Sequence, residues 1–114
     1  MKDEKDDLDE IFEALASRHR RAIIYRLSLQ PISISQLAKE RRLSLPAIHK
    51  HIEVLERAEF LLRKKSGRCN FLALNRKALL NLKDWISQFN PYWGSNKETL
   101  ANYVLEIQKN INLK

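Results

Sequence analysis

Cysteine and glycine are scarce in this chain of 114 residues, which contains one cysteine and two glycines. The single thiol, Cys69, can form neither an internal disulfide framework nor a metal site built from several thiolates. Two isolated glycines cannot build a glycine-rich loop around a phosphate, so that class of nucleotide site is excluded. No apolar run approaches the roughly 18 residues that a membrane span needs, and the charged N-terminus is unlike a secretory signal. We therefore expect a single-domain cytoplasmic protein that has no membrane partner.

Patterns typical of catalysis and of metal binding are also missing. His49 and His51 lie two positions apart, about 200° around a helix, so they cannot converge on one zinc ion as an i, i+4 pair can. No serine lies in the strand–turn–helix context of a nucleophile elbow. We therefore expect no enzyme activity, no cofactor and no metal site.

Positive charge is abundant, and it is concentrated in the middle of the chain. The formal net charge is +7, but residues 1–16 carry two lysines against seven acids. Residues 17–77 carry fifteen lysines and arginines against four acids, and residues 78–114 carry four lysines against three acids. Such a block indicates a polyanionic partner, either nucleic acid or an anionic membrane surface, unless it is merely a solvated basic surface. The order of the secondary-structure elements is needed to decide.

Periodic apolar residues predict a helix-rich fold. A break at Pro91 separates the last two predicted helices, and Ser95 to Glu98 is typical of a capping box that opens the last one. Further N-caps are expected at Ser17, at Ser35 before a short helix, and at Ser44. The helices are expected at residues 8–16, 17–30, 36–42, 44–59, 76–89 and 95–111.

Two apolar runs, at residues 60–62 and 71–74, flank a basic Ser-Gly turn and predict a β-hairpin. Residues 32–34 alternate between apolar and polar and could form one very short strand. The expected fold is mainly α, with five to six helices and a two-stranded wing. One domain is expected at residues 8–114, after an acidic and flexible N-terminus at residues 1–7.

The order of the predicted elements is that of winged helix-turn-helix DNA-binding proteins: a helix, a short helix, a turn, a capped helix and a cationic hairpin. The capped helix has the apolar rear face Ile48, Ile52 and Leu55, which leaves its first turn free for base edges in a major groove. The hairpin tip is placed to reach a phosphate backbone or a minor groove. The residues expected to contact double-stranded DNA are Arg41, Arg42, Ser44, Leu45, Pro46, His49, Lys50, Arg63, Lys64, Lys65 and Arg68.

The sequence resembles ArsR-type transcriptional repressors in several stretches. These are residues 11–16, 20–24, 34–38 and 43–58, followed by the Gly67-Arg68 turn. The resemblance extends over about residues 8–110. It implies a homodimer, built from the first and last helices, that binds an imperfect inverted repeat in its own promoter region. This agrees with the two terminal amphipathic stripes, which a small domain would leave partly exposed. The expected interface residues are Leu8, Ile11, Phe12, Leu15, Leu100, Tyr103, Val104, Ile107 and Ile111.

The chain departs from the family at the positions where many members sense metals. Residues 33–36 have no thiol where many members carry a cysteine pair, and residues 76–89 contain one acid, Asp84, and no histidine. A subgroup without metal sensing is therefore expected. Leu45 and His49 stand where the family often has Gln and Ser, so the family's operator sequence cannot be transferred.

Two functional hypotheses follow from the sequence. The first is a homodimeric, sequence-specific repressor, and the alternative is a winged-helix module whose basic face binds a protein partner, an anionic surface or DNA of any sequence. Among the remaining polar residues, His51 is expected on the buried side as a hydrogen-bonded core or phosphate-side group. His19 is expected to be an ordinary surface residue, and Cys69 a passive wing cysteine rather than a redox switch.

Overall fold

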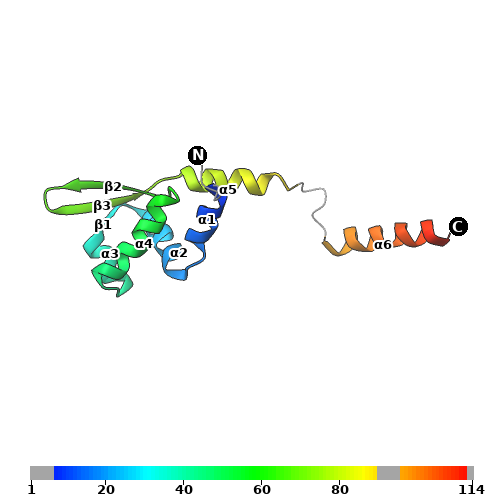
Figure 1. The fold of residues 1–114 in the computed structure, drawn as a ribbon, viewed down its shortest axis with the longest axis horizontal. Helices are drawn as coiled ribbons and strands as arrows, with labels where there is room; N and C mark the ends of the chain where they lie inside the picture. Colours follow the sequence, from blue (N-terminus) through cyan, green and yellow to red (C-terminus); the bar gives the residue numbers. More distant parts are fainter. Residues whose placement is uncertain (1–6, 90–95, 113–114) are drawn as a thin grey trace, which may run out of the picture. The chain divides into compact units, whose positions relative to one another are not determined.

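The structure, a computed structural model, describes residues 7–89 and 96–112. It divides into two compact units, Met1–Lys83 and Asp84–Lys114, which are described separately. The elements are α1 (Asp7–Leu15), α2 (Arg18–Leu29), β1 (Ile32–Ser33), α3 (Ile34–Arg41), α4 (Leu45–Arg57), β2 (Leu61–Ser66), β3 (Cys69–Leu74), α5 (Lys77–Ser87) and α6 (Asn96–Asn112) (Figure 1).

The expected elements are found within a few residues of their predicted bounds. Asp7, expected in the flexible N-terminus, instead belongs to the first turn of α1. The remainder of that segment, residues 1–6, lies outside the described residues, as do the expected break at Pro91 and the expected cap at Ser95.

Serine side chains begin three of the helices. The Oγ atoms of Ser17, Ser33 and Ser44 accept hydrogen bonds from the backbone N–H groups three residues later, at 3.4, 3.2 and 3.3 Å. Each serine has extended backbone angles, as an N-cap requires. The expected cap at Ser35 is therefore wrong by two residues, because the extended backbone of β1 ends at Ser33 and α3 begins directly after it.

The sheet has three antiparallel strands in the order β1-β3-β2. β2 and β3 form the wing, with Leu61 opposite Leu74 at its base and Ser66 opposite Cys69 at its tip. The short alternating segment pairs with the other side of β3, placing Ile32 opposite Leu72. The wing was predicted to have two strands, and β1 adds a third at its base.

The core of the first unit lies where α1 to α4 meet the base of the sheet. α4 contributes Ile48, Ile52 and Leu55, each 0% exposed, which confirms the predicted rear face of this helix. Ile11, expected at a dimer interface, is 1% exposed and packs in the core of its own chain. It therefore offers almost no surface to a second copy.

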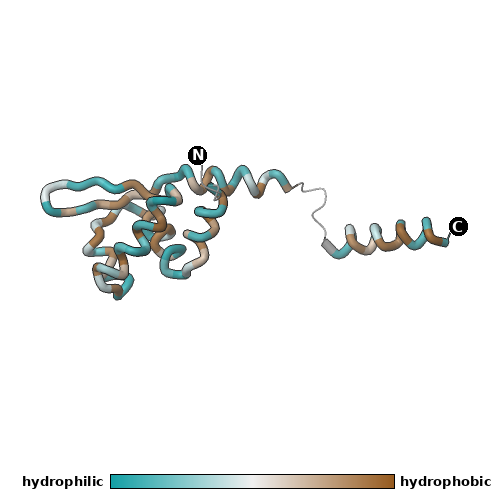
Figure 2. The backbone as a smooth tube through the Cα atoms, in the orientation of Figure 1, coloured by the Kyte–Doolittle hydropathy of each residue, from teal (hydrophilic) through white to brown (hydrophobic). Residues whose placement is uncertain are grey.

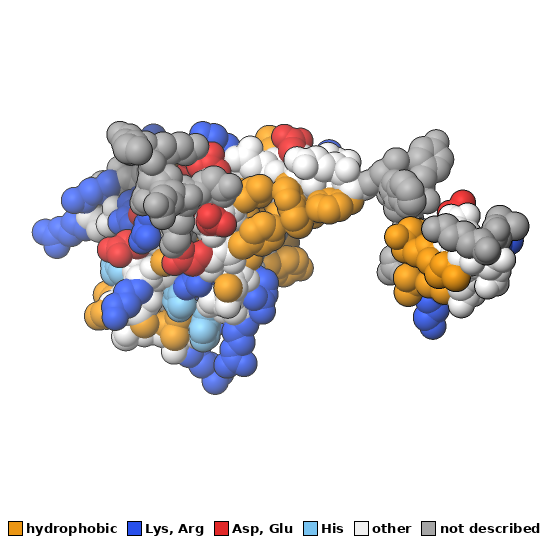
Figure 3. Space-filling model, turned by 45° about the vertical axis from the view of Figure 1, so that its right-hand side comes forward, with side chains coloured by type: hydrophobic (Ala, Val, Ile, Leu, Met, Phe, Trp, Pro, Cys, Tyr) orange, Lys and Arg blue, Asp and Glu red, His pale blue; other side chains and the backbone are white. Residues whose placement is uncertain are grey.

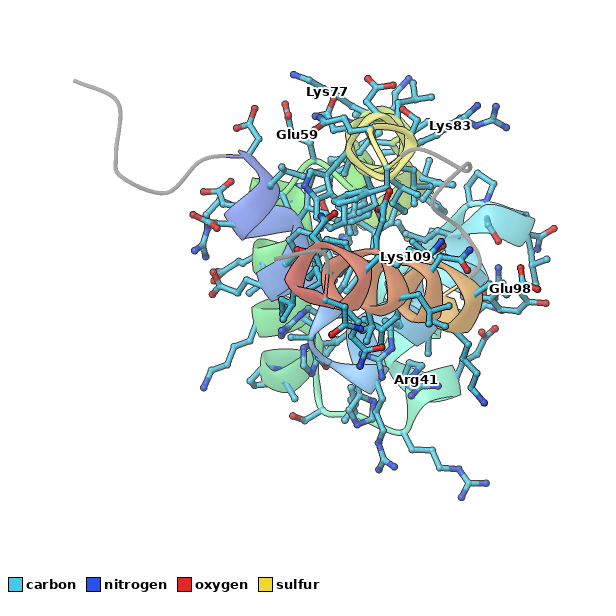
Figure 4. The ribbon with its side chains drawn as sticks, turned by 90° about the vertical axis from the view of Figure 1, so that its right-hand side faces the viewer. Arg41, Glu59, Lys77, Lys83, Glu98 and Lys109 are labelled. Atoms are coloured by element: carbon cyan, nitrogen blue, oxygen red, sulfur yellow. The ribbon has the colours of Figure 1, made fainter. Side chains whose placement is uncertain are left out.

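The corner between α4 and the wing is closed by polar contacts to α5. Glu59 has a φ of 62°, which turns the chain from the end of α4 into β2. Its backbone oxygen accepts from the N–H of Ala78 at 3.4 Å, and its carboxylate lies 3.1 Å from the Lys77 Nζ (Figure 4). These contacts fix the start of α5 beside the base of the wing.

The second unit contains the 17-residue helix α6. Its apolar residues recur along one stripe, and in Figure 2 brown segments alternate with teal along the helix. Leu100, Tyr103, Val104, Ile107 and Ile111 are between 40% and 65% exposed. None of the helices in the described ranges is both long and apolar enough to cross a bilayer.

The turn between α3 and α4 has an arginine in a backbone conformation that favours glycine. Arg42 has φ 55° and ψ 41°, and its N–H donates to the Lys39 carbonyl oxygen at 3.1 Å. The Leu43 N–H donates to the Ala38 carbonyl oxygen at 3.0 Å, which completes a Schellman motif. A side chain in this left-handed conformation is strained because its Cβ crowds the following carbonyl group.

We expect Arg42→Gly to raise the free energy of unfolding by about 0.5–1 kcal/mol, because glycine adopts this conformation without the steric cost. Urea unfolding of the whole chain measures the change. Arg42→Ala is the matched control, since it removes the same charge but keeps the strained Cβ. An equal gain from both variants would show that the charge, not the backbone, is responsible.

Candidate nucleic-acid interface

The first turn of α4 faces solvent because the opposite side of the helix is buried. Ser44 caps the helix and Pro46 lies in its first turn, where a missing N–H costs no intrahelical bond. Leu45 is 51% exposed, Pro46 and Lys50 are exposed, and His49 is half-buried. An exposed first turn on a rigidly packed helix is the arrangement that reads base edges in a major groove.

The wing carries its basic side chains beyond the core. From Leu62 to Cys69 every residue is exposed, including Lys64, Lys65 and Arg68. The tip is a two-residue turn in which Gly67 has a φ of +61°. Lysine and arginine side chains project from this unit in Figure 3, where they are drawn in blue. Such charges can contact phosphates whatever the base sequence.

A pocket of about 200 Å³ joins the start of α4 to the wing. It brings together three of the residues expected at DNA, Leu45, His49 and Arg68. α4 and the wing thus face a common concave surface, as expected if both elements contact one ligand. The full lining is Ser33, Ile34, Ser35, Leu45, His49, Arg68, Cys69 and Asn70.

Arg63, expected at DNA, forms an ion pair within the protein. Its Nη2 and Nε atoms donate to the two carboxylate oxygens of Glu56 at 2.6 and 3.2 Å. This two-pronged contact connects β2 to α4. Sequence analysis missed the pair because Glu56 and Arg63 lie on different elements.

Arg41, also expected at DNA, is turned toward α2. Its Nη2 lies 2.9 Å from the Nδ1 of His19, and its Nε is buried with no hydrogen-bond partner among the described residues. The expectation that His19 is an ordinary surface residue is wrong, since it contacts Arg41 across 22 positions of sequence. Arg42, the next residue, is exposed.

His51 is half-buried on the side of α4 that faces α2, and its expected hydrogen bond is confirmed. The Nη1 of Arg20 lies 3.3 Å from its Nδ1. Burial, followed by the charges of Arg20, His19 and Arg41, lowers the pKa of His51 from its ordinary value of 6.5. The same Arg20 side chain donates to the carbonyl oxygens of Ala14 and Glu13, at 2.8 and 2.9 Å, at the end of α1.

No group of three His, Cys, Asp or Glu side chains in the described ranges is arranged to hold a metal ion. Cys69 is free and exposed at the first position of β3. The absence of metal sensing stays a prediction.

Comparison with known proteins also indicates a helix-turn-helix in this part of the chain. A family profile described as a helix-turn-helix domain matches residues 15–63, which extend from the end of α1 to the start of the wing. The HTH-type transcriptional regulator Rv2034 of Mycobacterium tuberculosis is 31% identical over 81 residues, covering 71% of this chain and 76% of the relative.

The crystal structure of an ArsR family transcriptional regulator matches with 34% identity and a TM-score of 0.72, over 80% of this chain and all of the other. The chain belongs to the ArsR family of transcriptional regulators. A Mycobacterium bovis protein, Mb0332, described as a homodimeric winged helix-turn-helix DNA-binding domain and possible ArsR-family regulator, shares the fold. Its identity is 15% and its TM-score is 0.62, over 73% of this chain and 80% of that chain.

The ArsR family membership identifies α3, the Arg42 turn and α4 as a helix-turn-helix and β2–β3 as its wing. The protein is thus a transcriptional regulator with a helix-turn-helix DNA-binding fold.

In this ArsR-family chain we expect a double-mutant cycle on Arg63→Ala and Glu56→Ala to give a coupling free energy of about 1 kcal/mol. The contact is two-pronged and its side chains are 31% and 35% exposed. The Lys77–Glu59 pair is the control, because its side chains are 60% and 45% exposed and it should couple by less than about 0.5 kcal/mol. Urea unfolding measures both cycles, and equal coupling in the two would argue against a special role for Arg63.

Proposed function

We propose that this chain is a homodimeric, sequence-specific repressor that occupies an inverted-repeat operator, controls its own gene and blocks transcription by excluding polymerase. The observation that carries the proposal is the common concave surface between the exposed first turn of α4 and the basic wing. A dimer would place two copies of α4 in successive major grooves, about one helical turn of DNA apart. The cytoplasm is where such a protein would meet its operator.

The proposed DNA contacts divide into two kinds. Leu45, His49 and Lys50 extend from α4 toward base edges, and Lys50 can donate to guanine. Arg42, Lys64, Lys65 and Arg68 supply charge to phosphates, which positions the protein without reading sequence. Ser44 and Pro46 set the start of the recognition helix. Arg63 and Arg41 act within the protein, through Glu56 and His19.

We propose that the dimer forms through α6 together with α1. The apolar stripe of α6 is exposed within its unit, and orange side chains gather on this helix in Figure 3. On α1, Phe12 is 43% exposed, whereas Leu8 and Leu15 are partly buried against the core. Burying exposed apolar surface of this extent favours association. The homodimeric state of the M. bovis domain that shares the fold supports the proposal.

A salt titration on two duplexes of equal length tests the function. One duplex carries the region upstream of the protein's own gene, and the other a shuffled sequence of the same composition. We expect Lys50→Ala to weaken binding to the first duplex by about 1–3 kcal/mol. Replacing Lys64 and Lys65 by alanine should weaken binding to both duplexes and flatten the salt dependence by about one unit of slope per lost phosphate contact.

Lys83→Ala is the matched control for this titration, because Lys83 is an exposed lysine of α5 outside the proposed contacts. It should leave both affinities unchanged. Equal affinity of the wild-type protein for the two duplexes would contradict sequence-specific binding and favour a non-specific DNA-binding protein.

Ile107→Glu should convert the dimer into a monomer and abolish operator binding, because it places a charge in the apolar stripe of α6. Asn102→Glu adds the same charge on the opposite face of the helix and should preserve the dimer. Sedimentation equilibrium reports the mass of each variant. A dimeric Ile107→Glu protein would refute the proposed interface.

A further inference from the structure

Two arginine–imidazole pairs lie between the recognition helix and the helices behind it. Arg20 of α2 contacts the Nδ1 of His51 on α4 at 3.3 Å, and Arg41 of α3 contacts the Nδ1 of His19 on α2 at 2.9 Å. The two imidazole rings are 5.6 Å apart between centroids and tilted by 33°. The four side chains therefore form one cluster, which we call the imidazole latch.

The chemistry of the two pairs requires both histidines to be neutral. A guanidinium has five N–H donors, no acceptor and a permanent charge. Each Nδ1 must therefore accept, which places the imidazole proton on Nε2. A protonated imidazole donates from both nitrogens, so protonation would remove the acceptor and place a new charge beside the guanidinium.

The charges around His51 all oppose its protonation. His19 and Arg20 face it from α2 and Arg41 faces it from α3, and together with burial they lower its pKa. On the side of α1, the Arg20 side chain donates hydrogen bonds to the backbone carbonyl oxygens of Ala14 and Glu13. No carboxylate of the described residues contributes to the shift.

The latch connects every helix of the DNA-binding unit that packs around α4. Arg20 bonds at once to the end of α1 and to α4, and Arg41 holds the end of α3 against α2. The buried Nε of Arg41 has no partner in the described part of the chain, so this arginine depends on His19 for its polar contact there. Loss of the acceptors would thus loosen α4 and the turn that precedes it.

We propose that His19, Arg20, Arg41 and His51 position the recognition helix only while both histidines are neutral, so that mild acid loosens α4 and releases operator DNA. His19 and His51 are positioning residues, since they act on DNA through the placement of α4. The release of DNA rests on the proposed function, whereas the effect on the fold does not.

The sign of the pH dependence follows from linkage. A histidine whose pKa is lower in the folded than in the unfolded chain makes the folded state bind fewer protons, so stability rises with pH. The contribution of His51 is complete above the unfolded value of 6.5 and is lost as pH falls below 6.5 through the folded value. As pH falls below 6.5, the lowered pKa of His51 should raise the unfolding constant by at most about tenfold per pH unit.

Replacing a histidine by asparagine distinguishes the loss of a hydrogen-bond acceptor from the gain of a proton. The Asn Oδ1 takes the place of Nδ1 as an acceptor but cannot be protonated in this pH range. We expect the wild-type chain to lose stability between pH 6.5 and 5, measured by urea unfolding at constant ionic strength. The double variant His19→Asn/His51→Asn should show a flat profile in that range. His49→Asn, at a half-buried position of α4 outside the latch, is the matched control for this stability measurement and should keep the wild-type profile.

Operator affinity measured at pH 7.5 and 5.5 tests the second half of the proposal. Protonation elsewhere adds positive charge and would strengthen binding to DNA, so the expected loss in the wild type at pH 5.5 is opposite to a general charge effect. The double asparagine variant should keep its affinity at pH 5.5. Loss of affinity in that variant equal to the wild-type loss would overturn the proposal.

Failure of the proposed function and failure of the proposed pH dependence give different results. If no variant prefers the upstream duplex at pH 7.5, the proposed function fails and the stability profiles still decide the latch. Identical pH profiles for the wild-type and double-variant proteins would overturn the latch while operator binding stands. If the double variant does not fold, NMR titration of the His51 ring in the wild type decides, and a pKa at or above 6.5 refutes the proposal.

Discussion

The burial of one side of α4 is the constraint on which the rest of the structure depends. Ile48, Ile52 and Leu55 are completely enclosed, so the helix cannot rotate without exposing them. Because side chains of a helix repeat every 3.6 residues, fixing these three also fixes which residues face away. The outward direction of Leu45 and Lys50 is thus set by packing on the opposite side.

The sequence was sufficient to predict the features that local chemistry determines. Ser17 and Ser44 mark helix starts because a side-chain oxygen can satisfy an unpaired backbone N–H. The rear face of α4 follows from helical periodicity, and the wing from two apolar runs around a Ser-Gly turn. These features need only a few neighbouring residues. The order of the elements then predicted the winged helix-turn-helix fold.

Contacts between distant residues could not be predicted in the same way. The Arg20–His51 and Arg41–His19 pairs join residues 31 and 22 positions apart, and nothing in the local pattern selects them. Ile11 illustrates the same limit, since an amphipathic stripe does not say whether its apolar residues face the protein's own core or another chain. Only packing distinguishes the buried Ile11 from the exposed Phe12.

The bond between Arg63 and Glu56 has a consequence for the DNA as well as for the protein. Because this ion pair joins β2 to α4 near the base of the hairpin, it opposes changes in the angle between the helix and the wing. In the proposed complex a wing held in this way would adjust less to the width of the groove, which favours duplexes that bend or twist to meet both elements. The energy of that deformation depends on base steps that no side chain touches. Base steps between the two contact regions would then contribute to sequence preference only through how easily they deform, and flexible steps would be favoured.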